Sequence, residues 1–194
     1  MAADLHIERR LFHTLLGSVF PVAALFLEQG LFLLLLLAIT TAAVAGDAAR
    51  LLVPSLNRLF HQLFGRLLRE REAYRVTGAS YILLGTLGAF AIFPRDVAVL
   101  AVLFTSVGDP IAGLVGVRAP GWRAFGKSPV GSAAMAVAGM GVAGLLHAAG
   151  EISFGWPVVA GALVAAVVEL LPLRVDDNLR VPLVSGAAMV AVGM

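Results

Sequence analysis

The sequence predicts an all-α protein embedded in a membrane, and three observations support this fold class. Of its 194 residues, 60% are hydrophobic and only 13% are charged, whereas a soluble domain is nearer half apolar and a quarter charged. The apolar residues gather in runs close to the roughly 20 residues that one bilayer crossing requires. Runs such as 31–37 are unbroken apolar blocks, unlike the alternating strands of a membrane barrel. Helices are then the structures that satisfy every backbone polar group within lipid.

Two compositional facts exclude other classes of protein. The chain has no cysteine, which excludes a disulfide scaffold, a thiolate nucleophile and a cysteine-based zinc site. The high apolar content excludes a disordered chain.

Seven segments meet or approach the length of a membrane span, so a polytopic protein with about seven transmembrane helices is expected. The first is interrupted by Pro21 and the last is short. The predicted spans are about 11–27, 30–46, 76–93, 97–117, 129–148, 156–172 and 181–194. The chain is interpreted as a single membrane-embedded domain over residues 1–194.

The stretch from Pro54 to Glu72 has a different pattern, with apolar residues on one helical face. These are Leu56, Leu59, Phe60, Leu63, Phe64, Leu67 and Leu68. The opposite face carries Asn57, Arg58, His61, Gln62, Arg66 and Arg69. This spacing predicts a basic amphipathic helix that lies in the headgroup plane. A polar-faced extension of a neighbouring span is the alternative.

The positions of the basic residues predict the topology. If the inter-span regions alternate between the two sides of the membrane, all of the 14 lysines and arginines except Arg95 fall on one side. The positive-inside rule makes this side cytoplasmic. We therefore expect seven crossings in a cell membrane, with the N-terminus in the cytoplasm.

Polar residues that are costly at membrane depth gather on the same inner side. Ionisable groups inside a span cost about 2.5–3.5 kcal/mol each and usually face a bundle interior or a water-filled cavity. Asp109 and Glu169 are the two clearest examples. The other members of this inner set are Asp47, Arg50, Glu72, Thr77, Lys127, Asp177 and Asn178.

Carboxylates and basic groups at one membrane face favour phosphoryl or nucleotidyl transfer. Carboxylate oxygens suit Mg²⁺, which binds through one or two carboxylates plus substrate phosphates. Arginine and lysine suit the phosphates themselves. Catalysis of this kind depends mainly on positioning and charge neutralisation.

The segment from Gly121 to Ser128 matches the pattern GxxxxGK[ST] but is not interpreted as a P-loop. A P-loop follows a buried strand, and here an apolar helix and a turn precede it. Ser128 as N-cap and Pro129 at the first position predict a helix start, and such a start can bind an anion. Lys127 is the one lysine of the chain. Its alternative role is an ordinary positive-inside anchor.

Several motifs follow one another in an order that resembles a known family. They are Arg9-Arg10-Leu11-Phe12-His13 to Gly17, Asp47 to Arg50, Glu72 with Thr77-Gly78-Ala79-Ser80 to Gly85, Gly108-Asp109-Pro110 to Gly116, Gly126-Lys127-Ser128-Pro129-Val130-Gly131-Ser132, and Glu169 with Asp176-Asp177-Asn178 to Pro182. In this order they resemble the CTP-dependent lipid kinase family, which includes dolichol kinase, phytol kinase and yeast-type diacylglycerol kinase. The family is distantly related to phosphatidate cytidylyltransferases.

The resemblance implies transfer of the γ-phosphate of CTP to a lipid alcohol, with Mg²⁺. It implies Asp109, Glu72 and His13 as catalytic residues, with His13 orienting the acceptor hydroxyl. The implied nucleotide-binding residues are Lys127, Ser128, Gly126, Gly131, Arg123, Asp177 and Asn178. The implied metal ligands are Asp109, Asp177 and Glu169, and Asp47, Arg50 and Thr77 complete the polar site. Expected partners are a nucleoside triphosphate, a lipid alcohol and membrane lipids, and no nucleic acid.

Alternatives remain at the level of residues and of function. Asp47 and Arg50 could pair as a structural link between helices, Glu72 could belong to a charged helix end, and Asp177 and Asn178 could form a solvated turn. A cytidylyltransferase would attack the α-phosphate of CTP instead. A small ion-coupled transporter would distribute its polar groups along a path across the bilayer, whereas here they collect on one side.

Overall fold

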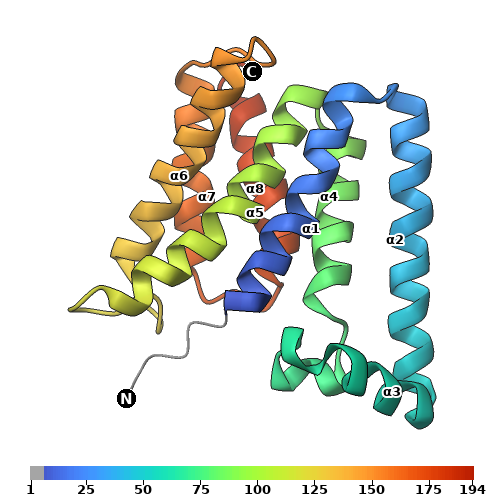
Figure 1. The fold of residues 1–194 in the computed structure, drawn as a ribbon. Coiled ribbons are helices and arrows are strands. Elements are labelled where there is room, and N and C mark those ends of the chain that lie inside the picture. The colour runs from blue at the N-terminus through green and yellow to red at the C-terminus, as the bar shows by residue number, and fades with distance from the viewer. Residues whose placement is uncertain (1–6) are drawn as a thin grey trace.

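The computed structural model describes residues 7–194, and over this range the secondary structure is helical apart from one isolated bridge between Ala124 and Lys127 (Figure 1). The elements are α1 (Ile7–Phe26), α2 (Gln29–Leu52), α3 (Pro54–Phe64), η1 (Gly65–Leu67), η2 (Glu70–Tyr74), α4 (Gly78–Ile92), α5 (Arg95–Arg118), α6 (Pro129–Ala148), α7 (Trp156–Leu170) and α8 (Asp177–Ala191). The predicted all-α class is confirmed, and each predicted span contains one helix.

Three of these helices, α2, α5 and α6, are long and apolar enough to cross a membrane. The apolar helices α4 and α7 have 15 residues each, about 22 Å at the rise of an α-helix, against a hydrocarbon core of about 30 Å. The number of seven crossings therefore stays a prediction.

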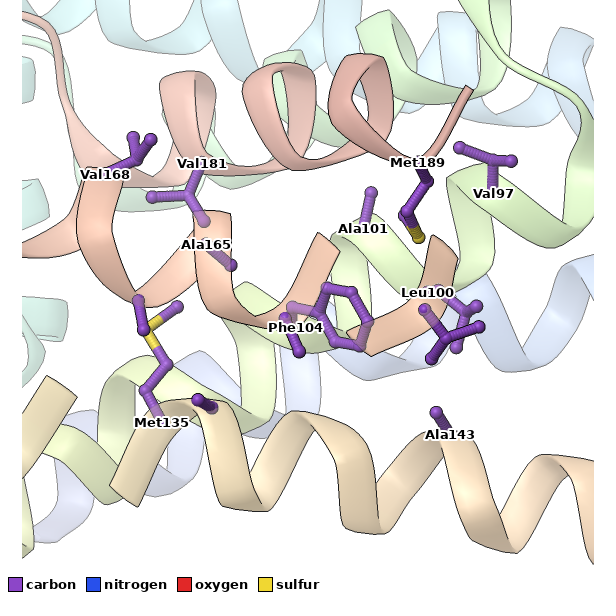
Figure 2. Close-up of a cluster of buried hydrophobic side chains, with 14 of the residues drawn as sticks. Val97, Leu100, Ala101, Phe104, Met135, Ala143, Ala165, Val168, Val181 and Met189 are labelled. Carbon is purple, nitrogen blue, oxygen red and sulfur yellow. The ribbon is translucent and has the colours of Figure 1, made fainter. Parts of the chain in front are cut away.

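Helix α5 is the centre of the bundle, and α1, α4, α6, α7 and α8 pack around it. Every residue from Val97 to Ser106 is buried. Figure 2 shows side chains of α5, α6, α7 and α8 meeting around Phe104, among them Met135 and Met189. Helix α2 stands at the edge of the bundle beside α4 (Figure 1). Its exposed leucines, such as Leu34 and Leu37, suit a lipid environment.

The helices of the bundle run alternately between its two ends (Figure 1). These helices are α1, α2, α4, α5, α6, α7 and α8. The start of α1 and the connections α2–α4, α5–α6 and α7–α8 lie at one end, which we call the polar end. The connections α1–α2, α4–α5 and α6–α7 lie at the other end, together with Arg95. The fold thus brings together in space the inner-side segments that the charge pattern groups in the sequence.

The amphipathic segment lies across the polar end (Figure 1), but the single helix predicted over residues 54–72 is wrong in extent. Helix α3 ends at Phe64, η1 follows, and Leu68 and Arg69 are extended before η2 begins. Gly65 weakens the helix where it ends, and Arg50 holds the returning chain through the carbonyls of Glu72 and Arg75. No residue of α3 is buried, which suits a helix lying on a surface.

Candidate functional site

A cavity of about 280 Å³ opens at the polar end and contains both Asp109 and Lys127. It lies among α1, α5, the α5–α6 connection, α6 and α7. Its polar lining residues are Arg9, Arg10, His13, Arg69, Asp109, Arg123, Lys127, Ser128, Ser132 and Glu169. Acids and bases from distant parts of the chain therefore share one hollow, as the sequence predicts for Asp109 and Lys127.

Packing of α1 against α5 brings His13 to Asp109. The hydroxyls of Ser18 and Ser106 are 3.2 Å apart across this contact, and Arg10 donates a hydrogen bond to the carbonyl oxygen of Pro110 at 3.0 Å. Between these two points, His13 Nδ1 lies 3.8 Å from Asp109 Oδ2. The imidazole is buried, whereas the Asp109 side chain is 27% exposed to the cavity side.

A tight turn presents Lys127 to the cavity. Ala124 and Lys127 exchange two backbone hydrogen bonds of 2.9 Å, and the two residues between them, Phe125 and Gly126, have φ of +53° and +84°. Two central residues with positive φ are the geometry of a type I′ hairpin turn, which glycine favours. Gly126 is therefore required by the turn, and the segment is a short hairpin after α5, not a P-loop.

The start of α6 follows the prediction. Ser128 is the N-cap, and its hydroxyl accepts a hydrogen bond from the backbone N–H of Gly131 at 3.3 Å. Pro129 is the first residue of the helix. Gly131 allows close approach to α5, because a Cβ atom there would lie 2.5 Å from the carbonyl oxygen of Ala112.

The ammonium group of Lys127 joins two acids. Nζ lies 2.7 Å from Glu169 Oε1 and 2.8 Å from Asp177 Oδ2, and it also donates to the carbonyl oxygen of Glu169. Partial burial on its own would lower the pKa of Lys127, but the hydrogen bonds to Asp177 and Glu169 outweigh burial and raise this pKa above its ordinary value. Lys127 is therefore a fixed positive charge at neutral pH.

Asp109, Glu169 and Asp177 each offer one carboxylate oxygen, and these oxygens all lie within 4.8 Å of one another. Hard oxygen donors at this separation fit Mg²⁺. Glu169 is further held by Ser132, whose hydroxyl donates to Oε2 at 3.0 Å. Arg180 donates to Asp177 Oδ1 from Nε at 2.7 Å. These second contacts fix both carboxylates in place.

Sequence reasoning missed several residues that line this cavity. Arg9, Arg10 and Arg69 line it but appeared in the sequence only as inner-side charges or motif members. Arg123, which was expected there, does line the cavity; it is exposed and donates hydrogen bonds to the carbonyl oxygens of Gly116 and Ala119. Ser132 ends the motif that begins at Gly126 and lies one helical turn after Ser128, but it was not predicted as a site residue.

Three expected site residues lie outside the cavity, in a separate buried cluster. Asp47 Oδ2 accepts hydrogen bonds from the backbone and hydroxyl of Thr77 and from the hydroxyl of Ser80, at 2.7–2.9 Å. Asp47 Oδ1 accepts from Arg50 Nε at 2.6 Å. Arg50 also donates to Asn57 and lies 4.8 Å from the centre of the Phe60 ring. The geometry of Asp47 and Arg50 is that of a structural link between α2, α3, η2 and α4.

Glu72, Asp177 and Asn178 border neighbouring cavities. Glu72 and Asn178 line a second, largely apolar cavity beside the first. Asp177, with Glu72 and Lys127, lines a third cavity that is rich in arginine. Asp177 and Asn178 belong to the first turn of α8 and not to a turn between helices.

Comparison with known proteins gives three relatives. An uncharacterized protein of Rickettsia prowazekii is 26% identical over 186 residues, which cover 93% of this chain and 91% of the relative. CTP-dependent diacylglycerol kinase 1 of Schizosaccharomyces pombe is 29% identical over 165 residues, 76% of this chain and 74% of the relative. CTP-dependent diacylglycerol kinase 1 of Eremothecium gossypii is 37% identical over 70 residues, 36% of this chain and 22% of the relative.

No family model and no solved structure matches the chain. The similarity to the two kinases is therefore a similarity of sequence. The Schizosaccharomyces pombe relative is matched over most of its length.

Proposed function

Because these relatives support the CTP-dependent lipid kinase family for this chain, we propose that the protein is a membrane-embedded kinase that transfers the γ-phosphate of CTP to the hydroxyl of a lipid alcohol. Diacylglycerol is the first candidate acceptor, since both kinase relatives are named for it. Polyprenol or dolichol and phytol are the other acceptors that the family resemblance implies.

The proposal places the reaction at the cytoplasmic face of a bundle with seven crossings. Its support is the gathering of the inner-side segments at the polar end (Figure 1) and the finding that, among residues 7–194, Arg95 is the one lysine or arginine at the opposite end. A nucleotide would reach the cavity from the cytosol and a lipid alcohol from the bilayer.

The observation that carries the proposal is the pairing of acids and cations in one cavity. Lys127 and the lining arginines supply the positive charge that a triphosphate needs. Asp109 and Glu169 of this cavity, together with Asp177 of the adjoining third cavity, would hold Mg²⁺, which would neutralise charge on the phosphate oxygens. Neither set would suffice alone, because the arginines repel a metal ion and the carboxylates repel a phosphate.

In the proposed step, the acceptor hydroxyl oxygen forms a bond to the γ-phosphorus, and the bond from that phosphorus to the β–γ bridging oxygen breaks. CDP leaves with the electron pair of that bond. His13 takes the hydroxyl proton, and Asp109, 3.8 Å from His13 Nδ1, stabilises the protonated imidazole. The products are a lipid phosphate and CDP.

The experiment is a labelling assay with protein purified in detergent and Mg²⁺. CTP labelled in the γ-phosphate is offered with diacylglycerol, a polyprenol or phytol, and a parallel series uses CTP labelled in the α-phosphate. The proposal expects labelled lipid phosphate from the γ-label alone. Lipid labelled from the α-label alone would show cytidylyl transfer and contradict the proposal, as would an absence of label with every acceptor.

A further inference from the structure

A second cavity of about 240 Å³ adjoins the first at the polar end. Its walls come from α1, α3, η1 and α4. The apolar side chains that line it belong to Phe12, Phe60, Phe64, Leu67, Leu68, Ala79 and Ile82. A cavity walled by aromatic and aliphatic side chains suits a hydrocarbon chain and not a triphosphate.

The two cavities meet at three shared residues, Arg9, His13 and Arg69. His13 is thus common to both walls, and its Nδ1 faces Asp109 of the first cavity at 3.8 Å. A molecule in the second cavity would therefore bring one polar end to the imidazole, while its apolar part lay against the aromatic and aliphatic side chains of that cavity.

Two of the residues that line the second cavity each carry a buried polar atom that lacks a hydrogen-bond partner within the described residues. They are His13 Nε2 and Asn178 Oδ1, on side chains of residues that are only 8% and 4% exposed. An unpaired buried polar atom is costly and calls for an explanation. Asn178 Oδ1 can only accept a hydrogen bond, and the imidazole can accept at one nitrogen. A hydroxyl group donates one hydrogen bond, so an alcohol would satisfy one of these two acceptor atoms.

The location of the cavity suits entry from the membrane surface. Helix α3 and η1, which form one wall, lie across the polar end (Figure 1), and α3 has no buried residue. Leu59 and Leu63 of α3 are 50% and 66% exposed. A helix with exposed leucines and a basic opposite face sits at the boundary between headgroups and acyl chains.

We propose that the second cavity binds the hydroxyl end of the lipid acceptor, with the alcohol beside His13 and the first part of the chain between α3 and α4. This inference rests on the proposed function and adds where the acceptor binds. The cavity is smaller than the 300–1,000 Å³ that encloses a drug-sized ligand, so the rest of the lipid lies in the bilayer. Selection then acts on the hydroxyl end, and the length of the tail has little effect.

A photoreactive diacylglycerol with a diazirine close to the glycerol tests this site without turnover. The full-length protein is cross-linked in detergent as the Asp109→Asn variant, and labelled residues are mapped by mass spectrometry. Labelling is expected on α3, η1 and the start of α4, with competition by unmodified diacylglycerol. Labelling confined to other surfaces, or unaffected by the competitor, would overturn the inference.

Ala79 provides a substitution that fills the cavity, and Ala91 provides its matched control. Both belong to α4, but Ala79 lines the second cavity and Ala91 is exposed near the opposite end. Ala79→Leu is expected to reduce cross-linking and to raise the KM for the lipid about tenfold or more, with the KM for CTP unchanged. Ala91→Leu is expected to leave cross-linking, the KM for the lipid and the KM for CTP unchanged.

Equal effects of the two variants, or a rise in the KM for CTP instead, would overturn the inference. The cross-linking result also separates it from the proposed function. Site-specific labelling without any kinase activity would leave the lipid site in place and contradict the kinase. Kinase activity that persists in Ala79→Leu, together with labelling at other surfaces, would contradict the lipid site and leave the kinase in place.

Discussion

Lys127 illustrates how one residue can serve both structure and chemistry. Its ammonium group holds Glu169 and Asp177, which would repel each other without it. The same group lines the cavity in which a triphosphate is proposed to bind. A lysine that served only as a positive-inside anchor would need neither the ion pairs with the two acids nor a place in the cavity. The site role and the anchor role of Lys127 can therefore be separated by experiment.

Lys127→Ala is expected to raise the KM for CTP about tenfold or more, because a charge beside the phosphates is lost. It is also expected to lower the melting temperature, because two carboxylates lose their partner. Arg118→Ala is the control, since Arg118 is an exposed basic residue at the same end and does not line the cavity. Equal behaviour of the two variants in steady-state kinetics and thermal unfolding would favour the anchor role.

At the scale of the elements, the contact between α5 and α6 sets the distance between Asp109 and Lys127. Asp109 lies on α5, and the turn that carries Lys127 leads into α6. At the closest point, Gly131 faces the backbone of Ala112, and a Cβ atom there would lie 2.5 Å from the carbonyl oxygen. A backbone oxygen cannot swing away as a side chain can, so a methyl group must push the helices apart.

Gly131→Ala is therefore expected to destabilise the protein by about 1–3 kcal/mol and to reduce turnover. Gly141→Ala is the matched control in α6, because nothing lies within 4 Å of a Cβ atom there. It is expected to leave activity unchanged. Thermal unfolding and turnover measured on both variants would contradict this account if Gly131→Ala behaved as Gly141→Ala does.

The elements also show what sequence reasoning reached and what it did not. Apolar runs predicted the helices, and charge segregation predicted their common polar end. The break at Gly65 was not predicted, because the apolar spacing continues through Leu67 and Leu68. Glu72 and Asp47 were grouped with Asp109, yet Glu72 lines the second cavity and Asp47 belongs to the buried structural cluster with Thr77. Which face of an apolar helix meets a cavity depends on tertiary packing, and a helix that is apolar on all sides gives no signal of it.

At the scale of the whole molecule, the proposed function requires that the polar end face the cytosol. The fold gathers the basic segments at that end, and the positive-inside rule predicts that this end faces the cytoplasm. The chain is well suited to a direct test because it contains no cysteine. Any introduced cysteine is then the sole thiol.

Arg66→Cys places a thiol at the polar end, and Glu151→Cys places one at the opposite end, both at exposed positions. A membrane-impermeant maleimide is expected to label Glu151→Cys in intact cells and Arg66→Cys only after permeabilisation. Gel-shift of the two labelled proteins gives the readout. Labelling of both from the same side, or the reverse order, would contradict the proposed topology.

The central claim is that the cavity around Asp109 transfers a phosphoryl group, and the most direct test compares two aspartates of α5. Asp109 lines the cavity, whereas Asp96 is exposed at the opposite end of the same helix. Transfer from γ-labelled CTP to diacylglycerol is expected to fall about 1,000-fold or more in Asp109→Asn, with thermal unfolding unchanged, and to persist in Asp96→Asn. Equal transfer by the two variants would contradict the account.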